Sequence, residues 1–321
     1  NYLDWYGSVF EKGARTTPPS DIVVVAVPVK MTNVIGSTAL EIREIGSFDD
    51  DIGDVWEHLG SLVVTTHKSV YVDGRRTGDG SKGLIKGVGF TRSNKPVTAC
   101  FFNGFNLEDQ VAHEDVASVL NPSEVMSYNG TLYARTGDKI LALTLTEVGS
   151  QNKVLAGPVV AANVLEHATR LYPGTAIQSL LGACYVSLFP VVGTHHQIRI
   201  AELDGGRIQD AKYDNKVLMV VGFKKGVYNR WVFRFDDEFQ TYDIRVIPDI
   251  KPEGLNFVTL DSGICVSMTE DETLELFPNT KGVNKSRVVT DPALSGEMRL
   301  YKKGGKVVFA KENKLYSLSL K

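Results

Sequence analysis

The chain of 321 residues is long enough for two average domains or for one large all-β domain. Apolar residues make up 43% of it and charged residues 23%, which is ordinary for a globular protein with a sizeable core. The net charge of −3 excludes a strongly basic surface, so nucleic acid is not expected as the main ligand. No apolar run reaches the roughly 18 residues that a membrane span requires, so membrane insertion is not expected.

Residues 1–20 are interpreted as an N-terminal arm that ends in a linker, because Thr-Thr-Pro-Pro-Ser at 16–20 interrupts regular structure. Trp5 and Tyr6 are the aromatic side chains with which this arm is expected to dock on the main body or on a partner. The first residue, Asn1, is what we expect of a processed product or of a fragment.

From residue 21 onward the apolar segments are short, rich in Val, Ile, Tyr and Phe, and bounded by Gly, Asn and Asp, which is typical of all-β proteins. The segments 130–145 and 305–320 align without a gap, each as an apolar strand, a short polar turn and an alternating strand. This pattern predicts β-hairpins with one buried face. Further hairpins are predicted to begin at Asp21, Gly60, Gly182, Asn215 and Gly263.

Seven such units correspond to roughly 40–50 residues each, the length of one four-stranded propeller blade. We therefore predict one β-propeller domain over residues 21–321, with seven blades, or six if the first hairpin does not form one. Two packed β-sandwich domains are the alternative. Two short helical insertions are predicted at 106–120, with Asn106 as N-cap, and at 158–172, with Pro158 in the first turn.

The densest acidic cluster comprises Asp49, Asp50, Asp51 and Asp54. Calcium loops of the EF-hand type place oxygen ligands at alternate positions, and Gly53 occupies a position where a ligand is needed. A solvated acidic loop is the simpler interpretation. An irregular metal site or a contact with a basic partner is the alternative.

The segment 78–83, Gly-Asp-Gly-Ser-Lys-Gly, matches the glycine spacing of a dinucleotide-binding turn. Such a turn must open a helix, whereas the following residues 84–90 alternate as a strand does. The acidic residue expected some twenty positions later is also missing. We therefore interpret this segment as an exposed connection rather than a nucleotide site.

His195 and His196 are the only adjacent histidines. Neighbouring strand residues point to opposite faces, so the two can share a metal only if they lie in a turn. No cysteine or carboxylate lies near them in sequence, and no metal or cofactor is predicted. Cys100, Cys184 and Cys265 are widely spaced in apolar contexts, which indicates buried free thiols. This favours a reducing intracellular compartment or a virion over disulfide-rich secretion.

Asp236, Asp237 and Glu238 lie among aromatic residues. Paired carboxylates beside aromatic rings are the groups that glycoside hydrolysis uses. Adjacent carboxylates in one turn cannot flank a sugar ring, so a turn between outer strands is the simpler interpretation.

The sequence contains no coherent catalytic set, so we expect a non-catalytic interaction platform or a structural subunit of a larger assembly, with other proteins as partners. A carbohydrate-active propeller, either a glycoside hydrolase or a lectin, is the alternative, with a glycan as its ligand. The residues expected to bind are the loop carboxylates, the histidine pair and the aromatic arm named above.

Overall fold

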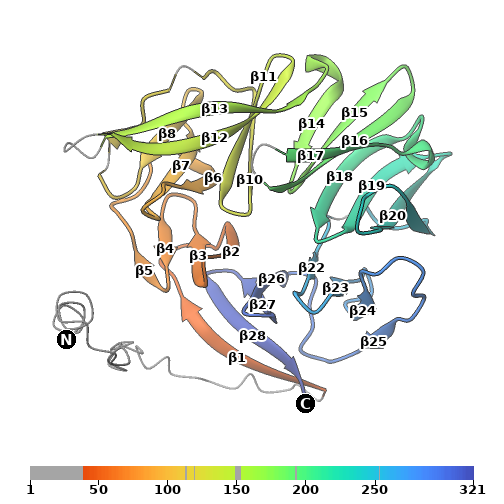
Figure 1. The fold of residues 1–321 in the computed structure, drawn as a ribbon. Helices are drawn as coiled ribbons and strands as arrows, with labels where there is room; N and C mark the ends of the chain where they lie inside the picture. Colours follow the sequence, from red (N-terminus) through yellow and green to blue (C-terminus); the bar gives the residue numbers. More distant parts are fainter. Residues whose placement is uncertain (1–38, 113, 119, 149–152, 192–193, 253) are drawn as a thin grey trace, which may run out of the picture. The chain divides into compact units, whose positions relative to one another are not determined.

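The computed structural model describes residues 39–321 except 113, 119, 149–152, 192–193 and 253. Over this part the chain forms seven four-stranded antiparallel sheets, arranged as the blades of a β-propeller (Figure 1). The predicted all-β fold and its seven four-stranded blades are thereby confirmed. The arm, its boundary near residue 20 and most of the hairpin predicted from Asp21 lie outside the described residues.

Within each blade the strands follow one another as an antiparallel meander. From the inner to the outer strand, blade 1 consists of β2 (Asp54–His58), β3 (Ser61–Thr65), β4 (Val70–Val72) and β5 (Arg75–Arg76). Blade 2 consists of β6 (Leu84–Phe90), β7 (Pro96–Phe101), β8 (Phe105–Asp109) and β9 (Glu114–Asp115). Blade 3 consists of β10 (Glu124–Tyr128), β11 (Thr131–Thr136), β12 (Lys139–Val148) and β13 (Lys153–Asn163).

Blades 4 to 7 follow the same order. Blade 4 consists of β14 (Thr169–Tyr172), β15 (Thr175–Leu180), β16 (Ala183–Val191) and β17 (Thr194–Arg199), and blade 5 of β18 (Arg207–Asp214), β19 (Val217–Lys224), β20 (Val227–Phe235) and β21 (Tyr242–Pro248). Blade 6 consists of β22 (Phe257–Thr259), β23 (Ile264–Met268), β24 (Leu274–Pro278) and β25 (Arg287–Val289). Blade 7 consists of β26 (Arg299–Lys303), β27 (Lys306–Lys311), β28 (Lys314–Leu320) and β1 (Leu40–Ser47).

The ring is closed by β1, which comes from the N-terminal side of the propeller and forms the outer strand of blade 7. It pairs antiparallel with β28, from Leu40 opposite Leu320 to Ser47 opposite Lys314. The carboxylate of Asp291 accepts hydrogen bonds from the backbone amides of Ala39 at 2.6 Å and Leu40 at 3.2 Å. Residues about 250 positions apart therefore hold the closing strand in place.

The strand order defines two faces of the propeller. The loops between blades and the turns between second and third strands lie on one face, which we call the connection face. The turns between first and second strands and between third and fourth strands lie on the other, which we call the opposite face. This assignment decides which loops can meet in one site.

The core is divided into seven clusters of buried apolar side chains, and each lies between two neighbouring blades. Second strands such as β19, with its sequence VLMVVG, are buried over nearly their whole length because other blades cover both faces of the sheet. Short turns between strands need positive φ, as at Asn129 and Gly130, where φ is 49° and 75°.

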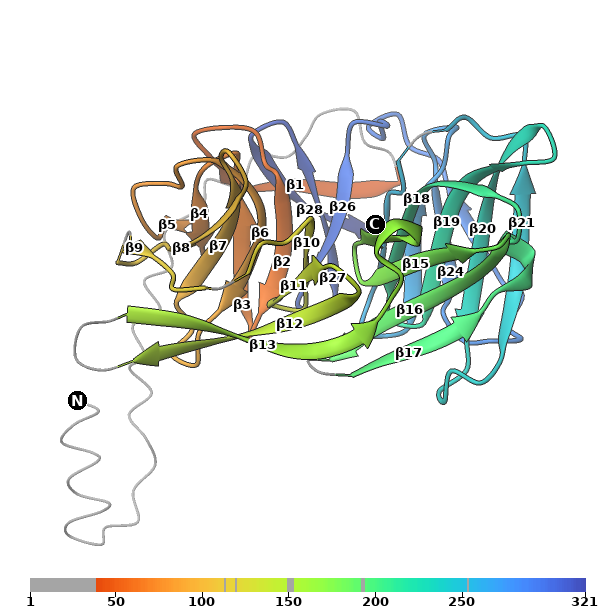
Figure 2. The same ribbon diagram turned by 90° about the horizontal axis from the view of Figure 1, so that it is seen from above.

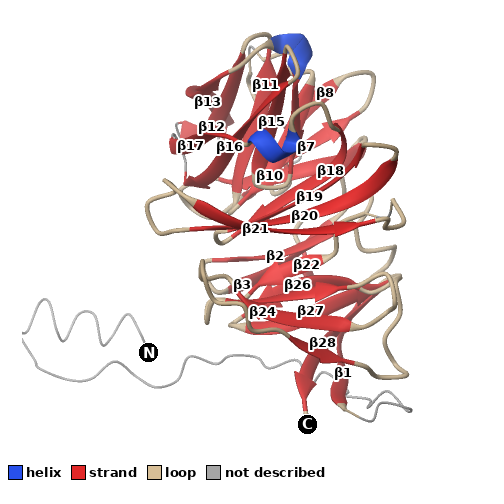
Figure 3. Ribbon diagram, turned by 90° about the vertical axis from the view of Figure 1, so that its right-hand side faces the viewer, coloured by secondary structure: helices blue, strands red, loops and turns tan. Residues whose placement is uncertain are grey.

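Both helical predictions were wrong. The only helices among the described residues are two three-residue 3₁₀ turns, η1 (Glu166–Ala168) and η2 (Ala201–Leu203), and strands dominate the view in Figure 3. Residues 106–120 contain most of β8 and all of β9, and the carboxylate of Asp109 accepts from the amides of Val111 at 2.8 Å and Ala112 at 3.1 Å. This is the bonding of a helix N-cap, used here to close a turn between strands.

Residues 158–172 contain most of β13, η1 and β14 instead of a helix. Pro158 lies in β13 opposite Leu143, on an outer strand where its missing N–H removes no ladder bond. Figure 2 shows β12 and β13 as a long pair of strands. The register of β12 with β13 runs from Lys139 to Val148, so the segment extends a hairpin and adds no helix.

Candidate functional site

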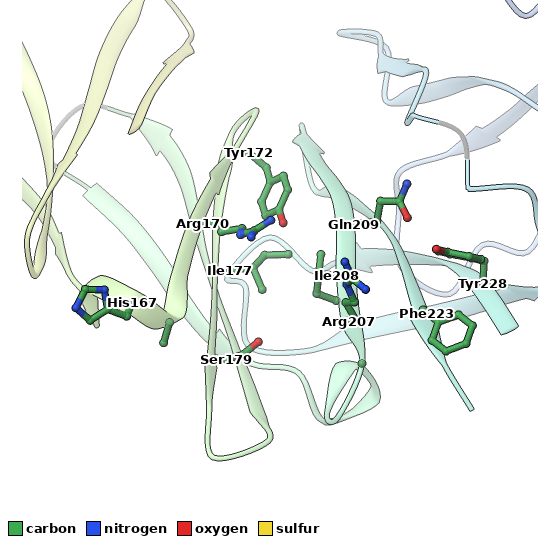
Figure 4. Close-up of a pocket in the computed structure, with 12 residues that line it drawn as sticks. His167, Arg170, Tyr172, Ile177, Ser179, Arg207, Ile208, Gln209, Phe223 and Tyr228 are labelled. Carbon is green, nitrogen blue, oxygen red and sulfur yellow. The ribbon is translucent and has the colours of Figure 1, made fainter. Parts of the chain in front are cut away.

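A groove of about 800 Å³ lies between blades 4 and 5 on the connection face (Figure 4). Its walls come mainly from β14 and β15 on one side and from β18, β19 and β20 on the other. The lining residues are His167, Ala168, Arg170, Tyr172, Ile177, Ser179, Gly206, Arg207, Ile208, Gln209, Phe223 and Tyr228.

Two exposed arginines from adjacent blades give this groove its charge. Arg170 lies in β14 and Arg207 begins β18, so the first strands of two blades each supply one guanidinium. No Asp or Glu is among the lining residues. Within the part of the chain that the structure describes, neither arginine forms an ion pair with a carboxylate. The groove therefore carries two cations and no lining carboxylate that pairs with them.

Strand register places apolar and aromatic groups beside these cations. Arg170 pairs with Ile177 across β14 and β15, and Arg207 pairs with Phe223 across β18 and β19. The Phe223 ring meets Tyr228 edge to face, with centroids 5.3 Å apart. Such pairs of arginine and aromatic residues are the side chains enriched in the energetically important centres of protein interfaces.

Tyr172 lies close to Arg170 in Figure 4. Burial raises the pKa of the Tyr172 phenol, and the charge of Arg170 opposes this rise. Two carboxylates also raise it, but both are already engaged. Glu124 accepts from Arg135 at 2.8 Å, and Asp210 accepts from the amide of Leu255 at 2.9 Å. Tyr172 therefore stays a neutral hydrogen-bonding group at physiological pH.

The turns around this groove expose apolar side chains. Leu181 is 99% exposed at the tip of the turn between β15 and β16. That turn lies against the loop entering blade 5, because the amide of Gly205 donates to the carbonyl of Gly182 at 3.0 Å. Phe223 lines the groove, and four further exposed apolar residues, Leu165, Leu180, Leu181 and Val227, lie within two residues of lining residues in the sequence; we call these five the apolar rim.

A second groove on the connection face, of about 1070 Å³, spans blades 5 to 7 and differs in its electrostatics. Three of its four lining cations have partners within the protein. Arg230 pairs with Glu270 at 3.0 Å, and the ammonium of Lys212 donates to the carbonyl of Phe257 at 2.6 Å. Arg299 donates to the carbonyl of Gly53 at 3.1 Å. These cations contribute to the structure and are less available to a ligand.

Asp49, Asp50 and Asp51 of the first acidic cluster lie in the loop between blades 7 and 1, and the side chains of two of them form local contacts. Asp49 accepts from the hydroxyl of Tyr71, and Asp50 lies 2.9 Å from a ring nitrogen of His67, while Asp51 is exposed. The pKa of Asp50 is lowered, first by the hydrogen bond from the amide of Asp51 and then by His67. These contacts describe an ordered acidic loop.

Asp54 is separated from that loop because it begins β2, where it lines the channel that the inner strands surround. Desolvation by the channel walls raises the pKa of its carboxyl, although the side chain still reaches solvent. Hydrogen bonding from the amide of Val55, at 2.9 Å, and the charges of Lys212 and Arg299 oppose the rise. The side chain therefore belongs to the channel and is not near the second acidic cluster.

The second acidic cluster, at Asp236, Asp237 and Glu238, lies in the turn between β20 and β21 on the opposite face. Asp236 accepts from the amides of Gln240 and Thr241, each at 2.9 Å, and Asp237 pairs with Lys216. Glu238 is exposed. The two acidic clusters thus lie on different faces and in different blades, so they do not converge around one sugar.

His195 and His196 both lie in β17, so the histidine pair is in a strand rather than a turn. The ring of His196 stacks on Phe239 of blade 5 with centroids 4.2 Å apart. Among the described residues, no three His, Cys, Asp or Glu side chains gather as a metal site. Trp5 and Tyr6 lie outside the described residues.

The three cysteines are free and buried. Burial raises the pKa of Cys100 and of Cys184 to about 11 and raises that of Cys265 as well. Thiols with raised pKa values carry little thiolate at neutral pH, so they are poor nucleophiles. The cysteines therefore act as small core residues.

The glycine-rich segment 78–83 is a loop that joins blade 1 to blade 2, and β6 follows it as predicted. The segment is not exposed throughout. Ser81 is 6% exposed, and its hydroxyl hydrogen-bonds to Thr98 at 3.0 Å and to Gln110 at 2.8 Å. A Cβ on Gly83 would lie 2.7 Å from the carbonyl carbon of Phe101. The glycine allows close packing and does not cradle a phosphate.

No protein-family model and no curated protein sequence matches the chain. Among solved structures, it is similar to the WD40 β-propeller domain of Doa1, with 12% identity, 88% of this chain and 96% of that chain covered, and a TM-score of 0.44. It is also similar to Hsv2 of Kluyveromyces lactis, with 11% identity, 85% and 98% covered, and a TM-score of 0.47. A third similar structure is the N-terminal domain of Nup159, with 9% identity, 91% and 97% covered, and a TM-score of 0.47.

These likenesses concern the fold alone, and the strand pairing itself establishes the seven-bladed propeller. Within the described part of the chain, no helix has the length and apolar character needed to cross a membrane.

Proposed function

We propose that this propeller is a non-catalytic protein-interaction platform and that the groove between blades 4 and 5 is a partner-binding site. The observation that carries the proposal is the combination of two cations without a carboxylate partner, Arg170 and Arg207, with an exposed apolar rim. Covering a surface of this composition with another protein lowers the free energy, because apolar area leaves water and the arginines gain hydrogen-bond acceptors. This role includes that of a structural subunit in a larger assembly.

A carbohydrate-active role receives no support from the predicted carboxylates, since Asp49–Asp51 and Asp236–Glu238 lie on opposite faces. The groove itself has no carboxylate that could serve as an acid or a nucleophile. Its chemistry is that of binding by arginine and aromatic groups. The proposal therefore retains only the interaction role.

The test is affinity capture from the native host with two double variants. Leu181→Asn with Phe223→Thr removes the centre of the apolar rim. Leu59→Asn with Phe102→Thr removes the same residue types from exposed sites in blades 1 and 2 and is the matched control. We expect the rim variant to lose a stoichiometric partner that the wild type and the control both retain. Equal recovery of every partner by all three proteins would contradict the proposal.

A further inference from the structure

We infer that the groove between blades 4 and 5 binds a carboxylate-rich segment of a partner protein that also carries an apolar side chain. This inference rests on the proposed function and names the chemistry of the partner. It follows from three properties of the groove: its charge, its apolar surface and its size.

The charge is the first property. Arg199 of blade 4 is paired with Asp204, where one nitrogen and one oxygen lie 2.6 Å apart. Arg170 and Arg207 differ, because no carboxylate lines their groove. A planar guanidinium binds a carboxylate through two parallel hydrogen bonds, and such charge-assisted bonds are the strong ones in protein interfaces. A ligand that supplies carboxylates provides the acceptors that the groove lacks.

The apolar surface is the second property. Tyr172, Phe223 and Tyr228 form aromatic parts of the walls, and Ile177 and Ile208 add aliphatic surface. Leu181 is 99% exposed in the turn that follows the lining residue Ser179. A purely ionic ligand would leave this surface uncovered, so an apolar side chain of the ligand is expected to pack against it.

Size and context favour a protein segment over nucleic acid. A volume of about 800 Å³ admits a few side chains of an extended segment and not a folded domain. Nucleic acid is bound by long stripes of Lys and Arg, whereas this chain has a net charge of −3 and only two arginines in the groove. Exposed leucines beside the cations match an amphipathic acidic peptide better than a phosphate backbone.

The inference is tested by fluorescence anisotropy with labelled synthetic peptides about ten residues long. The main probe alternates Asp and Glu around a central Leu. Comparison peptides replace the acids with Asn and Gln, replace the Leu with Ser, or carry phosphoserine in place of the acids. We expect the acidic peptide to bind at least tenfold more tightly than its amide form, and its affinity to fall as the salt concentration rises. The peptide with Ser in place of Leu is expected to bind at least fivefold more weakly than the acidic peptide.

Two charge-reversal variants make the test specific. The double variant Arg170→Glu with Arg207→Glu is expected to bind the acidic peptide at least tenfold more weakly than the wild type does and to bind a Lys-containing peptide instead. Arg92→Glu with Arg287→Glu changes the charge equally at exposed residues of the opposite face and should bind as the wild type does. Thermal denaturation will show that each variant is folded. If the Glu pair does not fold, the Gln pair at positions 170 and 207 replaces it with the same expected loss.

Equal binding of the acidic and amide peptides, or equal loss in both charge-reversal variants, would overturn the inference. Tenfold tighter binding of the phosphoserine peptide would overturn the choice of carboxylate and assign the groove to phosphoproteins. If the rim variant loses its partner in the capture experiment while no acidic peptide binds, the proposed function stands and this inference fails. The two failures are therefore distinguishable.

Discussion

Leu59 and Leu181 occupy the same position in equivalent two-residue turns on opposite faces of the propeller. Both have positive φ, 49° and 48°, both precede a glycine, and both side chains are exposed, by 78% and 99%. The left-handed conformation costs an L-residue roughly 1–2 kcal/mol, and an exposed leucine gains no core packing in return. Such local strain is often found where a residue serves binding. Leu181 lies two residues after Ser179, which lines the groove, whereas Leu59 lies in blade 1.

Replacing either leucine by asparagine should stabilise the protein. We expect Leu59→Asn and Leu181→Asn each to raise the free energy of unfolding by about 1 kcal/mol, because Asn tolerates positive φ. Urea denaturation will measure both changes, and partner capture should weaken for Leu181→Asn alone. A loss of stability in Leu181→Asn would place that leucine in the packing of the propeller and not in the binding surface.

Ring closure depends on the apolar side chains of β1. Ile42 is buried in the cluster between blades 6 and 7 and pairs with Leu318. We expect Ile42→Ala to cost about 3 kcal/mol of folding free energy, within the usual range for such cavities. Arg43→Ala on the same strand should cost little, because its ion pair with Glu41 is half-exposed. Equal thermal stability of the two variants would show that β1 does not close the ring.

The close approach at Gly83 gives a second stability test. A Cβ at this position would lie 2.7 Å from the carbonyl carbon of Phe101 and 2.9 Å from the Cβ of Phe102. We expect Gly83→Ala to destabilise the fold by about 2 kcal/mol, because the backbone cannot retreat without disturbing β7. Gly157→Ala is the control, since its nearest neighbour, the carbonyl oxygen of Thr144, is 3.6 Å away. A neutral Gly83→Ala in chemical denaturation would refute the packing role.

We expect acid to remove the contribution of the Asp236 carboxylate to the free energy of unfolding. Hydrogen bonding from the hydroxyl of Thr241, followed by bonds from the amides of Gln240 and Thr241, lowers the pKa of this carboxyl. The folded-state pKa is thus below the unfolded value of about 3.9, so the stabilisation is complete above that pH and is lost as the pH falls through the folded value. We expect Asp236→Asn to be less stable at pH 7 and to lose less stability on acidification.

Urea titrations between pH 7 and pH 3 will compare Asp236→Asn with the wild type. Glu238→Gln is the control, because Glu238 is an exposed carboxylate of the same turn. Parallel pH profiles for the wild type and Asp236→Asn would show that this carboxyl does not couple folding to protonation.

The number of blades could be predicted from the sequence because the turn chemistry recurs. Five of the predicted hairpins, those from Gly60, Gly130, Asn215, Gly263 and Gly305, are the second and third strands of a blade. In each, a turn rich in Gly or Asn precedes a strand that is buried on both faces. The hairpin from Gly182 is displaced by one strand, since β16 and β17 are the third and fourth strands of blade 4.

Blade 2 was not predicted as a hairpin because most of its third strand, β8, and all of its fourth, β9, lie within 106–120, where the N-cap signal at Asn106 predicts a helix. The glycines of its inner strand, β6, allow close packing of blade 3: a Cβ on Gly87 would lie 2.8 Å from Leu132, and one on Gly89 would lie 3.0 Å from Leu145. The last residues of the hairpin predicted from Asp21 form β1, which pairs with β28 as the outer strand of blade 7.

The groove could not be predicted from the sequence, because Arg170 and Arg207 are far apart in the chain and meet only through the packing of two blades. Neither arginine lies in a motif. One local signal was present, since Leu180 and Leu181 directly precede the turn glycine Gly182, where polar residues are usual. The sequence pattern favours loop carboxylates as binding residues instead, but several of them form hydrogen bonds or ion pairs within their own part of the fold.

A partner that binds in the groove between blades 4 and 5 should protect the strands of that groove, and hydrogen–deuterium exchange of the captured complex measures this protection. We expect slower exchange on complex formation in residues 165–182 and 205–228, with little change in the turns of the opposite face. Protection confined to other blades, with exchange at 165–182 and 205–228 unchanged, would show that partners do not bind in this groove.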